Sequence, residues 1–228
     1  MDQAGLRHEL KYEISLPTAA LLQSRLRAVM RPDPHAGPYG YYIRSLYFDD
    51  LDNHAYREKL DGLRERSKLR LRFYNFKDDF IVLENKEKIG DLTRKTAVPV
   101  SRAAAEAMMA GEHTSVHYPA HPLLERFRAL QTTTLLQPRV LVDYRRIPFV
   151  YPDSNVRVTI DLDVSTAPFR TELFRRDMAM VPAMDDGRAI LEVKFDRFLP
   201  PHLALALEDV PKARLAISKY VKCLSLLE

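Results

Sequence analysis

A run of alternating cations is the most restrictive feature of this sequence. The five cations occupy every second position of one segment: Arg64, Arg66, Lys68, Arg70 and Arg72. Strict period-two alternation indicates a β-strand, because residues i and i+2 of a strand share a face. Such a strand places the charges in one row, with neighbours roughly 6.6 Å apart. A row of like charges repels itself, so this face must meet water and salt or bind a polyanion.

The composition is that of a soluble chain in a reducing compartment. The 228 residues are 46% hydrophobic and 29% charged, and the net charge is +4. This supports a real core and is compatible with anionic partners. No stretch approaches the roughly 18 apolar residues of a membrane span. The single cysteine, Cys223, excludes an internal disulfide, and its apolar surroundings predict a buried thiol. We expect a cytoplasmic protein, or a cytoplasmic domain at the inner face of a membrane through a membrane-protein partner.

Hydropathy patterns predict about eight strands separated and followed by helices. The predicted strands are 7–14, 41–48, 64–74, 80–89, 92–98, 139–144, 155–164, 171–175 and 188–196. The predicted helices are 18–30, with Thr18 as N-cap, 53–60, 101–110, 122–132, 201–208 and 211–227. The connections are short, which favours an antiparallel sheet that closes into a barrel. No linker or low-complexity tract divides the chain, so residues 1–228 form one predicted domain.

Nearly every predicted strand has one charged face and one apolar face. The pattern Glu-x-Lys occurs at Glu9-Leu10-Lys11, Glu84-Asn85-Lys86 and Glu192-Val193-Lys194. In the strand 155–164, Arg157, Thr159, Asp161 and Asp163 fall on the face opposite Val156, Val158, Ile160 and Leu162. A solvated sheet face explains any one of these strands. The set, with its many arginines in register, instead favours charged faces turned into a barrel.

If a closed barrel holds the charged faces inside and helices cover the apolar outside, its lumen is a basic tunnel. An unpaired basic lumen is destabilising, and bound phosphates neutralise it through forked arginine hydrogen bonds and lysine charges. The few carboxylates beside those cations are suited to a divalent cation, which also binds phosphate oxygens.

These motifs resemble the triphosphate tunnel metalloenzyme superfamily, and within it the VTC domain, the polyphosphate polymerase domain of the vacuolar transporter chaperone family. The resemblance implies an α+β fold, an eight-stranded antiparallel β-barrel with helices packed outside. The matching segments cover the chain in order: 7–12, 45–49, 68–72, 83–86, 143–146, 157–161, 191–194 and 218–220. Hydrolases and cyclases of the superfamily open with two glutamates and a lysine at alternate positions. This chain has Arg7 in place of the first glutamate, which favours a VTC-type site over a triphosphatase site.

The resemblance implies roles for individual residues. The implied substrate-binding cations are Lys11, Lys68, Arg70, Arg72, Lys86, Lys95, Arg145, Arg157, Lys194, Lys219 and Lys222. Lys11, Arg70, Arg72 and Lys86 are the residues expected to act in catalysis. Glu192 matches the family's metal-coordinating glutamate, with Glu9 and Glu84 as further candidate ligands for Mn²⁺ or Mg²⁺.

The implied activity is transfer of the γ-phosphoryl group of ATP onto a growing inorganic polyphosphate chain. The acceptor is an anionic phosphate oxygen, so no general base is needed. Two alternatives stay open: a hydrolase of tripolyphosphate or nucleoside triphosphates, in which Asp161 could join the glutamates in holding two metals, and a non-catalytic polyphosphate-binding module. Nucleic-acid binding is not expected, because Tyr39, Tyr41 and Tyr42 accompany no nucleic-acid motif.

Overall fold

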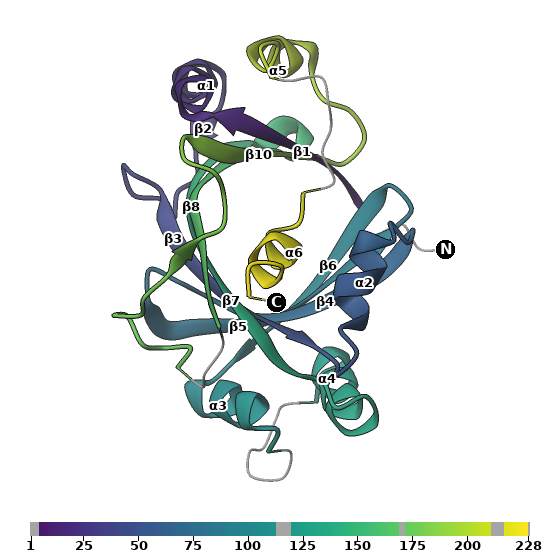
Figure 1. Cartoon of the computed structure of the whole chain (residues 1–228). Helices are drawn as coiled ribbons and strands as arrows, with labels where there is room; N and C mark the ends of the chain where they lie inside the picture. The colour runs from purple at the N-terminus through teal and green to yellow at the C-terminus, as the bar shows by residue number, and fades with distance from the viewer. Residues whose placement is uncertain (1–4, 113–119, 169–171, 211–216, 228) are drawn as a thin grey trace.

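A closed β-barrel forms the body of the molecule (Figure 1). The computed structural model describes residues 5–112, 120–168, 172–210 and 217–227. The eight long strands are β1 (Arg7–Ser15), β3 (Tyr41–Asp49), β4 (Glu65–Tyr74), β5 (Lys77–Ile89), β6 (Leu92–Val100), β7 (Gln137–Tyr151), β8 (Val156–Pro168) and β10 (Arg188–Phe195). Two-residue strands, β2 (Arg31–Pro32) and β9 (Val181–Pro182), attach to β7 and β8.

The strand order around the barrel is β7-β3-β4-β5-β6-β1-β10-β8, and pairing of β8 with β7 closes the ring. Every neighbouring pair is antiparallel. Local sequence sets the hairpins: β4 and β5 are joined by Asn75 and Phe76, both with positive φ (51° and 55°), as a tight hairpin requires. The predicted eight-stranded antiparallel barrel is confirmed.

Helices cover the outside of the barrel in two groups. Helix α1 (Leu16–Val29) and α5 (Pro201–Ala206) lie over β1, β8 and β10, where Leu22, Leu26 and Leu203 pack with the outward apolar residues of those strands. Helices α3 (Arg102–Ala110) and α4 (Pro122–Thr133) cover the outward side chains of β4, β5 and β6. The apolar strand faces therefore point outward to helices, which leaves the charged faces for the interior.

The lumen itself is divided. Its apolar half is a cluster of inward side chains around α6 (Lys219–Leu224), which lies inside the ring of strands in Figure 1. The members of this apolar half that matter below are Val140, Val142, Val164, Tyr220, Cys223 and Leu224. Cys223 is fully buried, and burial raises the pKa of its thiol to about 12, as expected for a structural cysteine.

Several predictions about local structure need correction. Residues 172–175 form a turn and not a strand, and Leu173 packs under it against the barrel. The N-cap of α1 is Ser15, whose Oγ accepts from the Thr18 N–H, so the helix begins earlier than predicted. Within the predicted helix 211–227, the helix spans Lys219–Leu224, and residues 211–216 lie outside the described part of the chain. None of the described helices is long and apolar enough to cross a membrane.

A β-bulge in β8 changes which charges enter the barrel. Asp163 has a left-handed φ of 56°, and the register between β7 and β8 shifts between Asp143 and Arg145. Arg157, Thr159 and Asp161 alternate inward as predicted, but Asp163 turns out to solvent and Val164 replaces it inside. The prediction that Asp163 shares the charged face was therefore wrong, because a bulge adds one residue to the strand and reverses the alternation.

Candidate functional site

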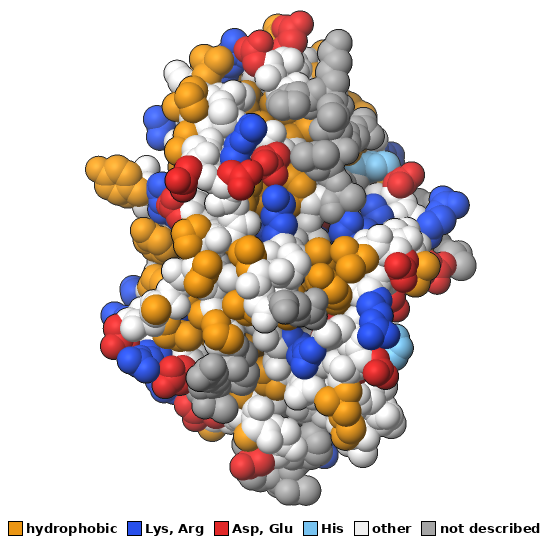
Figure 2. Space-filling view, in the orientation of Figure 1, with side chains coloured by type: hydrophobic (Ala, Val, Ile, Leu, Met, Phe, Trp, Pro, Cys, Tyr) orange, Lys and Arg blue, Asp and Glu red, His pale blue; other side chains and the backbone are white. Residues whose placement is uncertain are grey.

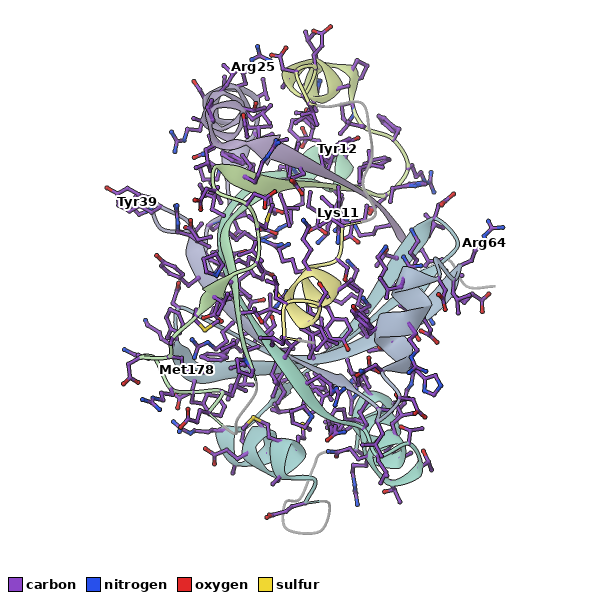
Figure 3. The ribbon with its side chains drawn as sticks, viewed as in Figure 1. Lys11, Tyr12, Arg25, Tyr39, Arg64 and Met178 are labelled. Atoms are coloured by element: carbon purple, nitrogen blue, oxygen red, sulfur yellow. The ribbon has the colours of Figure 1, made fainter. Side chains whose placement is uncertain are left out.

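The charged half of the lumen is a cavity of about 890 Å³. Fourteen cations line it among the described residues: Arg7, Lys11, Lys59, Arg66, Lys68, Arg70, Arg72, Lys86, Lys88, Lys95, Arg146, Arg157, Lys194 and Lys219. Three carboxylates, Glu9, Asp91 and Glu192, line it with them. Lys11 points from β1 into the barrel while its neighbour Tyr12 points outward (Figure 3). On the face in Figure 2, by contrast, acidic and basic side chains are interspersed. The whole chain has a net charge of only +4, so the basic excess is concentrated in the cavity.

Glu84 anchors one group of cations from behind the cavity wall. Its Oε2 accepts from Arg70 Nε at 2.8 Å and lies 3.5 Å from Arg72 Nη1, and its Oε1 lies 3.1 Å from Lys95 Nζ. Glu84 is 1% exposed. Burial acts to raise the pKa of this carboxyl, but Arg72 and Arg70 hold the pKa well below its usual range. The carboxylate stays ionised and fixes Arg70 in a forked geometry suited to a phosphate.

Asp161 anchors a second group. Arg146 binds it in a bidentate pair, with Nε 2.6 Å from Oδ1 and Nη2 2.8 Å from Oδ2. Lys219, the first residue of α6, lies 2.5 Å from the same Oδ2. Arg146 also reaches Glu192 Oε2 at 3.3 Å. Close approach of β3 and β7 requires Gly40 here, since a Cβ at that position would lie 2.0 Å from the Arg146 carbonyl oxygen.

Glu9 and Glu192 form the acidic centre of the cavity. Lys194 bridges them, with Nζ 3.4 Å from Glu9 Oε1 and 3.2 Å from Glu192 Oε2. Lys86 pairs with Glu9, and Lys11 lies 3.4 Å from Glu192. Burial acts to raise both carboxyl pKa values, but the surrounding lysines lower them, so both groups are ionised.

These two carboxylates fit a divalent metal ion. Glu9 Oε1 is buried and accepts no hydrogen bond from the described residues, since its contact with Lys194 at 3.4 Å is an ion pair only. Mg²⁺ and similar ions are commonly held by one or two carboxylates, with substrate phosphate oxygens and water completing the coordination. No cluster of three or more metal-ligating side chains occurs in the described ranges. Glu84 does not join the pair, because it lies outside the cavity lining and contacts Arg70, Arg72 and Lys95.

Not every cavity lysine is balanced by a carboxylate. Burial lowers the pKa of Lys86 to about 7, with Lys11 and Lys194 acting in the same direction against Glu9 and Glu192. Burial and the charges of Lys11 and Lys59 hold the pKa of Lys68 well below its usual range. Lys68 donates to Ser218 Oγ at 3.0 Å and has no carboxylate partner among the described residues. A bound anion would relieve this strain by supplying the missing negative charge.

Tyrosine hydroxyl groups orient three of the arginines. Arg70 Nη1 donates to Tyr47 Oη at 2.6 Å, and Arg72 Nη2 donates to Tyr144 Oη at 2.9 Å. Arg157 Nη2 lies 2.9 Å from the hydroxyl of Tyr41 and also pairs with Asp33 at 2.6 Å. A neutral hydroxyl fixes a guanidinium without cancelling its charge, so these arginines keep their attraction for an anion.

The structure brings together most of the residues predicted for the site. Those that line the cavity are Lys11, Lys68, Arg70, Arg72, Lys86, Lys95, Arg157, Lys194 and Lys219, with Glu9 and Glu192. Arg145 does not: it pairs with the exposed Asp163 outside the barrel, because alternation along β7 places Arg146 inside. Lys222 also lies outside the cavity lining and contacts Glu13 at 3.2 Å.

Sequence reasoning missed several cavity residues. Arg146 could have been found, because it lies an even number of residues from Val140, Val142 and Tyr144, which all face inward. Arg66 belongs to the alternating row and lies inside, whereas Arg64 precedes β4 and is exposed. Lys59 on α2 (His54–Leu60) has no strand periodicity that could reveal it.

The closed antiparallel barrel with a basic lumen is the triphosphate tunnel fold. The chain belongs to the VTC domain family, whose model matches residues 6–228. Among solved structures, it is similar to a chain of the Schizosaccharomyces pombe Mediator head module (9% identity, 88% of this chain and 89% of that chain, TM-score 0.48). It is also similar to the Mimivirus capping enzyme triphosphatase (13% identity, 91% and 88%, TM-score 0.41). No curated protein matches it in sequence.

Proposed function

We propose that this domain is a polyphosphate polymerase that transfers the γ-phosphoryl group of ATP to the terminal phosphate of an inorganic polyphosphate chain. The observation that carries the proposal is the excess of fourteen cations over three carboxylates in the lining of one cavity. A chain of phosphates is the ligand that matches this charge along its length. Membership of the VTC family supports the same substrate class.

The proposed reaction exchanges one P–O bond for another. A terminal oxygen of the acceptor chain attacks the γ-phosphorus, the bond to the β-phosphate oxygen breaks, and ADP leaves with that electron pair. The acceptor oxygen is already anionic, so no side chain has to remove a proton. Catalysis then rests on positioning and charge stabilisation.

Arg70 and Arg72 supply forked donors held by Glu84 and by tyrosine hydroxyls, and are proposed to grip the transferring phosphoryl group. Lys11 and Lys86 lie beside the acidic pair and add positive charge there. Glu9 and Glu192 would hold a Mn²⁺ or Mg²⁺ ion. When bound, the ion supplies further neutralisation of the phosphate oxygens.

One observation favours transfer over hydrolysis. Arg7 lines the cavity where hydrolases of the superfamily have a glutamate, and Asp161 is occupied by Arg146 and Lys219. Glu9 and Glu192 also contact lysines, but they line the cavity and Glu9 Oε1 accepts no hydrogen bond. Among the described residues this leaves one candidate pair of metal ligands and not the larger set that two metal ions would need.

The test is incubation of the purified protein with ATP and Mn²⁺, followed by gel analysis for polyphosphate and an assay for free phosphate. Long chains are expected from the wild type, and Arg70→Ala and Glu192→Gln should both abolish them. Arg102→Ala, which removes an exposed arginine paired with Asp78 and Glu106, is the control and should retain the product. Free phosphate without polymer would assign the protein to the hydrolases, and polyphosphate binding without either product would make it a binding module.

A further inference from the structure

A second group of cations lies at the rim of the cavity, where β4 begins and β5 ends. Arg66 is the second residue of β4 and Lys88 the last but one of β5, and the two are paired directly across the strands. Lys59 approaches them from α2. All three are half-buried and line the cavity. We call Lys59, Arg66 and Lys88 the rim cations.

The rim cations differ from the deeper ones in what neutralises them. Most deeper cations have carboxylate partners, as in Arg70 with Glu84 and Arg146 with Asp161, although Lys68 contacts only the Ser218 hydroxyl. Within the described part of the chain, no rim cation forms an ion pair with a carboxylate. Like charges directly opposite on neighbouring strands are destabilising, and Glu58 offsets this repulsion at Arg66 only in part, since the two form no ion pair. Burial, followed by Arg66, Lys11 and Lys88, lowers the pKa of Lys59 to about 8.

The fold holds Lys59 in this unfavourable position. Asp49, which is 2% exposed, accepts from the backbone N–H groups of Ala55 and Tyr56 at 2.9 and 3.0 Å and so caps α2. Tyr220 of α6 donates its hydroxyl to the same carboxylate at 2.5 Å. Asp49 therefore links α2, which carries Lys59, to α6 inside the barrel. These contacts hold Lys59 beside Arg66 and Lys88.

We propose that the rim cations form a separate subsite for the phosphates of a polyphosphate chain that extend beyond the triphosphate-sized site at Arg70, Arg72 and the Glu9–Glu192 pair. This inference rests on the proposed function and refines it, because it makes the length of the anion the property that the cavity recognises. A triphosphate engages the deep cations alone, whereas a long chain engages both groups. The longer ligand then supplies the ion-pair partners that the rim cations lack within the described part of the chain.

The test is titration calorimetry of the double variant Arg66→Gln/Lys88→Gln with tripolyphosphate and with long-chain polyphosphate, at several salt concentrations. Long-chain affinity is expected to fall about tenfold or more, and the slope of log affinity against log salt to fall by about one for each cation removed. Tripolyphosphate affinity should stay within about twofold of wild type. The tenfold loss expected for the long chain corresponds to about 1.4 kcal/mol of binding free energy.

The matched control is Arg94→Gln/Arg126→Gln. It removes two arginines of the same region that pair with Glu87 outside the cavity lining, and should change neither affinity. Equal losses for both ligands in the rim variant, or no loss for the long chain, would overturn the subsite, as would a wild type that does not bind long chains. If the wild type binds long chains in this length-dependent way but makes no polymer from ATP, the polymerase proposal fails while the subsite stands.

Discussion

The two halves of the lumen use the same strands for opposite purposes. Along β7 the inward positions run Val140, Val142, Tyr144 and Arg146, so one strand passes from the apolar half to the charged half within seven residues. In the apolar half the chain fills its own barrel with α6. In the charged half it leaves a cavity whose cations outnumber its carboxylates.

The difference between the two halves shows that binding specificity in this barrel comes from which inward side chains the protein leaves without partners. Alternation decides only which residues point inward, and both halves satisfy it. The apolar half is complete without a ligand, since Tyr220, Cys223 and Leu224 are buried by the strands around them. The charged half is not complete, because its cations need anions that the protein supplies only in part.

Removing a buried charge should give the largest effect and would show how much the charged half depends on its internal pairs. Arg146→Met leaves Asp161 and Glu192 without their guanidinium partner, and should lower the free energy of unfolding by about 3–5 kcal/mol. The measurement is urea unfolding without ligand. Arg145→Met, which loses only an exposed pair with Asp163, should stay within about 0.5 kcal/mol of wild type. Equal effects of the two substitutions would contradict the inward assignment of Arg146.

Replacing Arg70 should reduce catalysis far more than it reduces the stability of the fold. Arg70→Ala removes a forked donor but leaves Glu84 with Arg72 and Lys95, so the protein should fold. Turnover of ATP should fall about 100-fold or more, which is the usual cost of removing a donor that stabilises transition-state charge. Steady-state kinetics with ATP and Mn²⁺ measures this, and circular dichroism checks the fold. A change in KM alone would show that Arg70 only binds the substrate.

The apolar half should respond in stability and not in ligand binding. Leu224→Ala removes a side chain that is 4% exposed and packed between α6 and the strands, and should cost about 3 kcal/mol. Polyphosphate affinity of the folded variant should match the wild type in calorimetry at low temperature. A loss of affinity would mean that the two halves are coupled.

The smallest effect is a pH dependence confined to the charged half. The pKa values of Lys86 and Lys59 fall to about 7 and about 8 on folding, mainly through burial. Between these values and about 10 the unfolded chain binds more protons, so the free energy of unfolding should rise with pH. Urea unfolding across this range measures the rise, and Lys86→Met should reduce it. Saturating polyphosphate should suppress the rise, because the anion keeps the lysines protonated. A free energy of unfolding that falls with pH over this range would contradict the lowered lysine pKa values.

Periodicity was enough to predict the two-faced antiparallel strands and most of the charged half, and the family resemblance added the eight-stranded closed barrel. The alternating row placed Lys68, Arg70 and Arg72 on one face, and all three line the cavity. Alternation did not reveal the bulge at Asp163, because its left-handed conformation reverses the face without a glycine to mark it. Lys59 escaped prediction for a different reason: a helix brings it to the barrel through tertiary contacts that no local pattern encodes.

The central claim is that the charged half holds a polyphosphate chain. Titration of long-chain polyphosphate into Arg72→Gln and Arg145→Gln tests it most directly, since the first arginine lines the cavity and the second lies outside it. We predict that Arg72→Gln weakens binding about tenfold or more and that Arg145→Gln stays within about twofold of wild type. Equal losses in both variants, or no binding by the wild type, would contradict the account.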